Sequence, residues 1–398
     1  MILLNKQESE VYKMKNVKDN RYTQEILTEI LDSKWFGSYY SPLEVIKNNT
    51  PYTLTFGGRD LGKTYAWTIC MLAIWQYKGK RSVLLRRMAD TLKPSKAGGF
   101  FDKVFKSGII KNVKEYEGIT YRTGKWCGFW IDEKGKKTYD EPFCYSFALS
   151  SKIEMNKGIS DIEDLAIVFF DEALTADNYL PDEWSRFLNA VSTLIRDNST
   201  AMVVLSANTV SWVAPYFREF GIKDPKKIKQ GTIEIVKGMG DTAVTVEYCK
   251  DTLGSREKKI VDKRFFGFGG GTSKMIRTGG WEVHSYQHLT RDMLDGRNID
   301  LISRDLYIAY ENEILCLELY ELEDFGLLVN VRPARDFEKG IRIYCIDNRT
   351  DPRYQYRPDG KDKLDLLIWG LYKRNRFYYA DNMCGETVYK YLQEVKML

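Results

Sequence analysis

The segment from residue 57 to 64 reads GGRDLGKT and fits the spacing GxxxxGK(S/T). Its glycines let the backbone curl until several N–H groups face one point, and Lys63 and Thr64 follow directly. The apolar segment TLTF precedes the turn at 53–56, and KTYAWTICMLAIWQY begins at its end, at 63–77. The first is typical of a short buried strand, and the second of a helix packed on a sheet. A glycine-rich turn in this context predicts a P-loop, which is a cradle for phosphate groups.

This P-loop predicts an ATP site in which each residue type has a definite task. We expect Lys63 to reach the β and γ phosphates and Thr64 to bind Mg²⁺ through its hydroxyl group. The helix that begins there adds the positive end of its dipole. The residues predicted to contact the nucleotide are Gly57, Gly58, Arg59, Asp60, Leu61, Gly62, Lys63 and Thr64.

A second part of the site is predicted where Asp171 and Glu172 follow the apolar segment LAIVFF. Asp171 is placed to hold Mg²⁺ through water, and Glu172 is placed to polarise the attacking water. A glutamate directly after the aspartate indicates an ATPase of the ASCE type, whereas GTPases and kinases position their nucleophiles differently. Asn208 ends the next apolar segment, AMVVLSAN, and is a candidate to face the γ-phosphate. A simple strand-end cap is the alternative for this asparagine.

The order of segments predicts an α/β protein with several parts. Buried strands alternate with helices over residues 1–250, which predicts a P-loop ATPase domain with a parallel sheet and flanking helices. Hairpin-like segments at about 95–150 predict a β-rich insertion or lid within it. A basic and glycine-rich stretch predicts a linker region at 251–297. Strand-like segments and a final amphipathic helix predict a small α+β domain at 298–398.

Composition excludes several classes of protein. The chain has 43% apolar residues, yet no apolar run approaches the roughly 20 residues that span a bilayer, so we expect no membrane partner. The seven cysteines are scattered without a CxxC spacing, which indicates reduced thiols and a cytosolic location. The formal charge of +5 permits a polyanionic partner such as nucleic acid without requiring one.

Three stretches resemble the DNA-packaging ATPase of small phi29-like tailed bacteriophages: FGGRDLGKTYA (56–66), AIVFFDEALTADNYLPDEWSRFLN (166–189) and TLIRDNSTAMVVLSANTVSWVAPYF (193–217). The resemblance implies a terminase-like, ring-forming motor, in that family a pentamer, that hydrolyses ATP and pumps double-stranded DNA into a prohead. It also implies the prohead portal as a partner, with a packaging RNA as a further candidate. The implied location is the host cytoplasm and, transiently, the portal vertex of the prohead.

Two residues gain a role only from this resemblance. Arg196 falls where the family has an arginine finger that reaches the active site of the neighbouring subunit. Without the resemblance, it is a charge near the C-terminal end of a helix, where the dipole favours a cation. Lys157 falls near a second lysine that acts in trans in the family, although its spacing to Asp171 differs.

The C-terminal domain of this family resembles an RNase H-like nuclease that lacks its metal-binding carboxylates. Here Tyr310 stands where a nuclease has an aspartate, and Asp347 and Asp381 alone make a poor two-metal site. We therefore expect a vestigial domain that binds DNA or the portal. An ATP-dependent terminase nuclease and a non-translocating P-loop ATPase that binds a partner are the alternatives.

DNA is expected to bind through its phosphates and without sequence recognition, because a packaging motor must pass every sequence. A solvated charge run is the alternative reading of the basic residues concerned. The candidates are Lys258, Lys259, Lys263 and Arg264.

Overall fold

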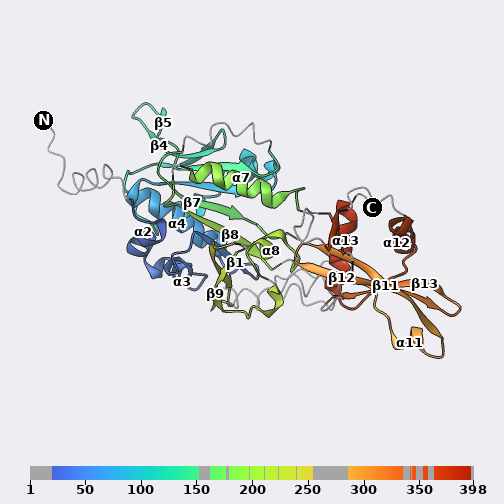
Figure 1. Cartoon of the computed structure of the whole chain (residues 1–398). Helices are drawn as coiled ribbons and strands as arrows, with labels where there is room; N and C mark the ends of the chain where they lie inside the picture. The colour runs from blue at the N-terminus through green and yellow to red at the C-terminus, as the bar shows by residue number, and fades with distance from the viewer. Residues whose placement is uncertain are drawn as a thin grey trace. The chain divides into compact units, whose positions relative to one another are not determined.

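The computed structural model of the chain divides into two compact units, shown in Figure 1. The first comprises Met1–Thr175, Asp182–Thr209 and Lys227–Gly280, and the second comprises Ala176–Pro181, Val210–Lys226 and Trp281–Leu398. The residues that the structure describes are 20–151, 162–175, 179–196, 198–209, 211–222, 224–238, 240–253, 286–334, 341, 343–346, 353–356 and 363–395.

A ten-stranded sheet forms the centre of the first unit, counted over the described residues. Its order is β3-β4-β6-β2-β7-β8-β1-β10-β9, with β5 paired to β4. The strands from β6 to β10 in this order run parallel, as the alternation of strands and helices predicts. The central strands are β1 (Tyr52–Gly57), β2 (Arg81–Arg86), β7 (Leu165–Asp171), β8 (Met202–Asn208), β9 (Ile233–Lys237) and β10 (Ala243–Tyr248).

Helices cover both faces of this sheet, as the contacts of β7 show. Successive residues of a strand point to opposite faces of its sheet. Phe169 packs against Trp67 of α4, whereas the next residue, Phe170, stacks on Phe187 of α7. The helix predicted at 63–77 is therefore confirmed as α4, and α7 is the helix that follows Asp171 and Glu172 in the chain. The helices of this unit are α2 (Thr23–Ile30), α3 (Leu43–Lys47), α4 (Lys63–Lys78), α5 (Pro94–Ala97), α6 (Asp102–Ser107) and α7 (Glu183–Ile195), with the 3-10 turns η1 (Ser33–Phe36) and η2 (Ala89–Leu92).

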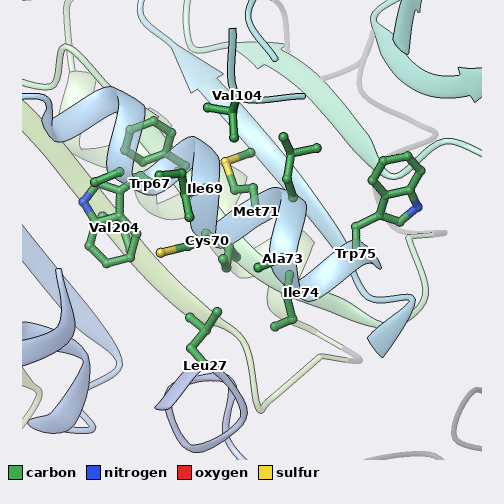
Figure 2. Close-up of a cluster of buried hydrophobic side chains, with 14 of the residues drawn as sticks. Leu27, Trp67, Ile69, Cys70, Met71, Ala73, Ile74, Trp75, Val104 and Val204 are labelled. Carbon is green, nitrogen blue, oxygen red and sulfur yellow. The ribbon is translucent and has the colours of Figure 1, made fainter. Parts of the chain in front are cut away.

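The core of the first unit surrounds α4, which is apolar on all sides. Figure 2 shows side chains of α4 surrounded by Leu27 of α2, Val104 of α6 and Val204 of β8. Trp67 and Ile74 of α4 are completely buried. A helix enclosed in this way fixes the position of its first residue, where the P-loop ends.

The β-rich segment predicted at about 95–150 extends the central sheet. Its last strand pairs in parallel with β2, from Ser82 beside Cys144 to Arg86 beside Ala148. The other strands add antiparallel ribbons at that edge. The segment thus forms one edge of the central sheet. Its strands are β3 (Gly118–Arg122), β4 (Lys125–Ile131), β5 (Lys137–Tyr139) and β6 (Cys144–Ala148).

The second unit contains a six-stranded sheet among its described residues, in the order β15-β14-β11-β12-β13-β16. The strands β11, β12 and β13 are antiparallel, while β14 runs parallel to β11 and β15 parallel to β14. An antiparallel meander is thus extended by parallel strands at both sides, with β16 running parallel to β13. The elements are β11 (Ile299–Tyr310), β12 (Glu313–Leu322), β13 (Gly326–Pro333), β14 (Ile343–Cys345), β15 (Tyr354–Tyr356), β16 (Phe377–Tyr379), α8 (Pro215–Glu219), α11 (Arg291–Leu294), α12 (Lys363–Lys373) and α13 (Asn382–Glu394), with the 3-10 turn η4 (Pro225–Lys227) at its boundary with the first unit.

Residues 210–226 belong to the second unit, although the predicted ATPase domain ran without interruption to residue 250. Ser211 donates a hydrogen bond to Glu386 of α13 at 2.6 Å, and the buried Lys390 donates to Ser211 at 3.2 Å. These contacts join the chain that follows β8 to the last helix. Most of the predicted linker at 251–297 lies outside the described residues. Among the residues described, no helix combines the length and the apolar character that a membrane span needs.

Candidate active site

Three parallel strands bring the sequence-predicted residues to one edge of the sheet in the first unit. Gly57 of β1 lies beside Asn208 of β8 in register, and Asp171 of β7 lies beside Ser206 of β8. Because these strands run in the same direction, the segments that follow them leave the sheet on the same side. The carboxyl edge of an open α/β sheet is the usual place for a bound ligand.

The P-loop joins β1 to α4 through a tight curl of the backbone. Asp60 and Gly62 have φ angles of 61° and 90°, in the left-handed region that favours glycine. Gly57 has no room for a side chain, because a Cβ atom there would lie 2.9 Å from Cys249 Cβ and 2.9 Å from Leu61 Cδ1. The curl leads into α4, whose first N–H groups lack partners within the helix. This combination suits a chain of phosphates.

Lys63, the first residue of α4, directs its ammonium group back toward the loop. Its Nζ donates to Gly58 O at 2.7 Å, to Gly57 O at 3.2 Å and to Asn208 Oδ1 at 3.4 Å. Burial lowers the pKa of Lys63, and nearby acidic groups, Asp171 among them, oppose that effect. The Lys63 ammonium group thus connects the P-loop with the end of β8.

Thr64 and Asp171 come together as the sequence predicts. The Thr64 hydroxyl group donates to Asp171 Oδ1 at 2.9 Å. Asp171 is 4% exposed, and burial raises the pKa of its carboxyl group while the Arg86 guanidinium opposes the rise. A hydroxyl and a carboxylate oxygen at this separation fit Mg²⁺, which prefers oxygen ligands and keeps several waters. The described residues hold no group of three His, Cys, Asp or Glu side chains suited to a metal, so any Mg²⁺ here would rely on few protein ligands.

Glu172 lies in the turn directly after β7, with a left-handed φ of 62°. Its side chain is 64% exposed and accepts a hydrogen bond from Arg86 Nη1 at 2.6 Å. The other terminal nitrogen of Arg86 donates to Asp171 Oδ2 at 2.7 Å. One guanidinium group therefore bridges the two acids that the sequence predicts for metal binding and water activation.

Arg86 was missed by the sequence analysis, although the sequence contained a signal for it. In the segment SVLLRR (82–87), two arginines directly follow residues typical of a buried strand, so they stand at its carboxyl end. A charged side chain at this position reaches the active-site edge of a parallel sheet. Recognising the contact required the strand order, because β2 lies beside β7 although about 80 residues separate them in the chain.

A buried hydrogen bond supports the P-loop from behind. Tyr40 donates its hydroxyl hydrogen to Glu247 Oε2 at 2.7 Å, and the Tyr40 N–H donates to Leu61 O at 2.8 Å. Burial raises the pKa of Glu247 to about 7, while the hydrogen bond from Tyr40 and the charge of Lys63 act in the opposite direction. The loop is therefore held by contacts that the motif itself does not include.

The remaining predicted residues are not all at this edge. Arg59 is exposed in the loop, beside Asp60. Arg196 is exposed and caps the C-terminal end of α7, whereas Glu183 begins that helix. Lys157 lies outside the described residues, as do Lys258, Lys259, Lys263 and Arg264.

The second unit uses its candidate nuclease positions for structural contacts. Tyr310 is buried, and its hydroxyl group donates to Glu394 Oε1 at 3.0 Å. The Asp381 carboxylate accepts from Cys384 N at 2.9 Å and so caps the N-terminus of α13. Asp347 lies outside the described residues. The described residues of this unit therefore do not form the acidic cluster that a two-metal nuclease requires.

Several known proteins are similar to this chain in sequence or in fold. The DNA packaging proteins of Bacillus phages PZA and phi29 are each 21% identical to it over 187 residues, which is 46% of this chain and 50% of each relative. The chain thus spans about half the length of the curated relatives it matches. A solved structure described as the Phi-28 gp11 DNA packaging motor aligns with a TM-score of 0.52 and 16% identity, over 90% of this chain and 98% of that chain, which shows a shared fold. The family model for the Podovirus DNA encapsidation protein (Gp16) matches residues 35–251, more than half of the chain, and the chain therefore belongs to that family.

Proposed function

We propose that this protein is an ATPase motor that translocates double-stranded DNA into a preformed prohead. The observation that carries the proposal is the convergence of Lys63, Thr64, Asp171 and Glu172 at one sheet edge. Membership of the DNA encapsidation family supports the coupling of that site to DNA. The packaging proteins of phages PZA and phi29 support the same assignment.

The chemistry follows from the positions of these side chains. The N–H groups of the P-loop and of the first turn of α4 would bind the phosphates, with Lys63 neutralising their charge. Thr64 and Asp171 would hold Mg²⁺, which supplies further charge neutralisation when it is bound. Glu172 is the base that accepts a proton from the attacking water. Since Arg86 donates a hydrogen bond to the Glu172 carboxylate, Glu172 must exchange part of that contact for the water.

Asn208 is proposed to sense the γ-phosphate. Its amide oxygen, at the end of β8, accepts a hydrogen bond from Lys63 Nζ at 3.4 Å. Its position beside Gly57 in register supports contact with the nucleotide. The strand-end cap remains the alternative, and it predicts no effect of an Asn208→Ala change on nucleotide binding.

Arg196 is proposed to act in the active site of a neighbouring subunit. Glu183 begins α7 near the acids of its own site, whereas Arg196 is exposed at the other end of this 13-residue helix. At ~1.5 Å per residue the two ends are roughly 20 Å apart. An exposed cation at that distance can serve another subunit better than its own. Lys157 is proposed as a second group acting in trans, on the resemblance alone.

A ring of subunits is part of this proposal, and five is the number that the resemblance implies. The ring would assemble in the host cytoplasm and dock transiently at the portal vertex of the prohead. A packaging RNA is a further proposed partner. DNA would be held through its phosphates, for which Lys258, Lys259, Lys263 and Arg264 are the candidates.

Mixing two inactive variants tests the shared active site. Lys63→Ala subunits lack the P-loop cation but keep Arg196, whereas Arg196→Ala subunits keep an intact P-loop. In mixed rings, some interfaces join an intact P-loop to an intact Arg196, so DNA-stimulated ATPase activity should partly return. Arg186→Ala, another arginine of α7, serves as the matched control and should keep its activity unmixed. Near-wild-type activity of Arg196→Ala alone would remove the finger from the proposal.

The same preparations separate the alternatives. A motor hydrolyses ATP faster when proheads and DNA are both present, whereas a P-loop ATPase that binds some other partner does not. Absence of rescue in rings shown to contain both variants would favour a role of Arg196 within its own subunit, or a ring in which one inactive site stops all others.

A further inference from the structure

Arg87 follows β2 and lies next to Arg86, but its guanidinium group contacts different atoms. It is 12% exposed and lies over the ring of Phe170, with Cζ 5.8 Å from the ring centroid. No motif in the sequence indicates a role for this residue. Its hydrogen bonds connect the turn that carries Glu172 with the start of α7.

The first set of contacts is to backbone carbonyls in the turn after β7. Arg87 Nη1 donates to Glu172 O at 3.2 Å, and Nη2 donates to Ala173 O at 2.6 Å. Glu172 has a φ angle of 62°, which is an unfavourable conformation for a residue with a side chain. Such a conformation persists only when the surrounding contacts hold it. The two carbonyl bonds are contacts of this kind.

The second set of contacts is to Glu183, the first residue of α7. Arg87 Nε donates to Glu183 Oε2 at 2.7 Å, and Nη2 donates to Glu183 Oε1 at 3.0 Å. The Glu183 side chain is only 1% exposed, and a buried carboxylate needs partners such as this guanidinium group. The paired carboxylate in turn fixes the plane and direction of the guanidinium group.

We propose that Arg87 is a positioning residue for ATP hydrolysis, which rests on the proposed role of Glu172 as the base. Arg87 holds the backbone of Glu172 in the left-handed conformation that directs its side chain away from the strand. The Glu183 carboxylate fixes the position of Arg87. The first turn of α7 and the turn that carries Glu172 are therefore joined through Arg87. Arg86 differs from Arg87 because it contacts the carboxylate of Glu172 and not the backbone.

The geometry of the contacts makes the proposal specific to arginine. Arg87 makes four hydrogen bonds with a planar fork, whereas a lysine offers a single nitrogen with the same charge. Arg87→Lys therefore keeps the cation but loses the bridge between Glu183 and the carbonyls. A small displacement of a reacting group can lower a rate by about 10²-fold without loss of binding. We expect kcat for ATP to fall by about that factor, and the Kd of ATP to stay within about twofold.

The experiment compares Arg87→Lys, Glu183→Gln and the double variant in the full-length chain. ATP affinity is measured by equilibrium binding, kcat and KM by DNA-stimulated hydrolysis, and folding by thermal unfolding. Because both residues act through one contact, the double variant should be no slower than Arg87→Lys alone. Arg81→Lys is the matched control, since Arg81 begins β2 and also bonds a carboxylate, Glu141, and a backbone carbonyl, Glu163 O at 3.3 Å.

The results separate this inference from the proposed function. A loss of kcat with unchanged ATP affinity, in the Arg87 and Glu183 variants but not in Arg81→Lys, supports the positioning role. Wild-type kcat in Arg87→Lys, or an equal loss of affinity and activity, overturns it. If Arg87→Lys does not fold, Glu183→Gln decides in the same way. Glu172→Gln is measured alongside, because normal turnover in that variant contradicts the proposed base instead.

Discussion

Lys63 is a buried cation whose neighbours are mainly carbonyl oxygens. Its ammonium group donates to Gly57 and Gly58, and burial lowers its pKa from the ordinary value of 10.5. The charge is therefore costly in the folded protein and would be stabilised by the negative charge of phosphates. A buried lysine of this kind indicates a role in binding phosphates and not in stabilising the fold.

Replacing Lys63 with alanine should abolish ATP hydrolysis, because the phosphates lose the cation of the P-loop. We expect kcat to fall at least about 10²-fold, the scale for loss of one charge-stabilising group. The melting temperature should stay unchanged or rise, since a desolvated charge is removed. Hydrolysis rates and thermal unfolding measure both effects. Substantial turnover in Lys63→Ala would contradict the role, and a large drop in melting temperature would contradict the argument from burial.

At this scale the sequence predicted the residues whose contacts lie within one motif. Lys63 and the glycines of the loop are recognisable because their spacing along the chain fixes their geometry. Thr64 and Asp171 were both predicted as metal ligands, and the structure places their oxygens 2.9 Å apart. Arg86 and Arg87 were missed because their partners lie at the end of β7, in the turn that follows it and at the start of α7, all distant in the chain. No spacing rule identifies such contacts before the strand order is known.

The strand β10 lies beside β1, which leads into the P-loop, and carries the buried acid Glu247. Glu247 is 9% exposed and accepts a hydrogen bond from Tyr40 at 2.7 Å. Its pKa of about 7 in the folded chain exceeds the ordinary value of 4.5. The folded state thus binds the Glu247 proton more tightly than the unfolded state does. Ionisation of this group destabilises the fold.

Replacing Glu247 with glutamine should therefore flatten the dependence of stability on pH. Below about pH 4.5 the carboxyl group is protonated in both states and imposes no penalty, whereas the wild type loses roughly 3 kcal/mol as the pH rises through about 7. The amide cannot ionise, so that loss should be absent from the variant. Urea unfolding of both proteins at pH 5 and pH 8 measures the difference. If the unfolding free energy changed equally between pH 5 and pH 8 in both proteins, the pKa of Glu247 would not be raised in the folded state.

The predicted elements agree with the structure where a strong hydrophobic pattern defines them. The helix predicted at 63–77 is α4, Lys63–Lys78, and the apolar segment LAIVFF before Asp171 lies within β7, Leu165–Asp171. Hydrophobic pattern says less about pairing. It suggested hairpins in the segment 95–150 but not that β6 joins the central sheet beside β2. Hydrophobic periodicity indicates which face of a strand is buried, but it does not identify the strands that pair with it.

The whole molecule departs from the predicted domain order because the chain enters the second unit more than once. Residues 176–181 follow the turn of Glu172, and residues 210–226 follow Asn208; both segments belong to the second unit. Contiguous domains were predicted because composition does not change at either crossing. The segments that leave the ends of β7 and β8 are thus built into the unit proposed to bind DNA or the portal.

The second unit should have no nuclease activity. Tyr310 and Asp381 are engaged with Glu394 and with the N-terminus of α13, and neither is part of an acidic cluster among the described residues. We expect supercoiled plasmid to remain intact with Mg²⁺ or Mn²⁺, as followed by gel electrophoresis. Nicking that needs Mn²⁺ and disappears in Asp347→Ala or Asp381→Asn would favour the terminase nuclease instead.

The most direct measurement of the central claim is DNA packaging by Glu172→Gln. Purified proheads, double-stranded DNA, ATP and the protein are incubated together, and the DNA protected from nuclease is measured beside the ATP consumed. Wild-type protein should protect DNA in proportion to ATP hydrolysed. Glu172→Gln should bind ATP and DNA normally yet protect no DNA and hydrolyse no ATP, since the amide cannot accept a proton from water. Packaging by this variant at the wild-type rate would contradict a motor driven by the site at Lys63, Asp171 and Glu172.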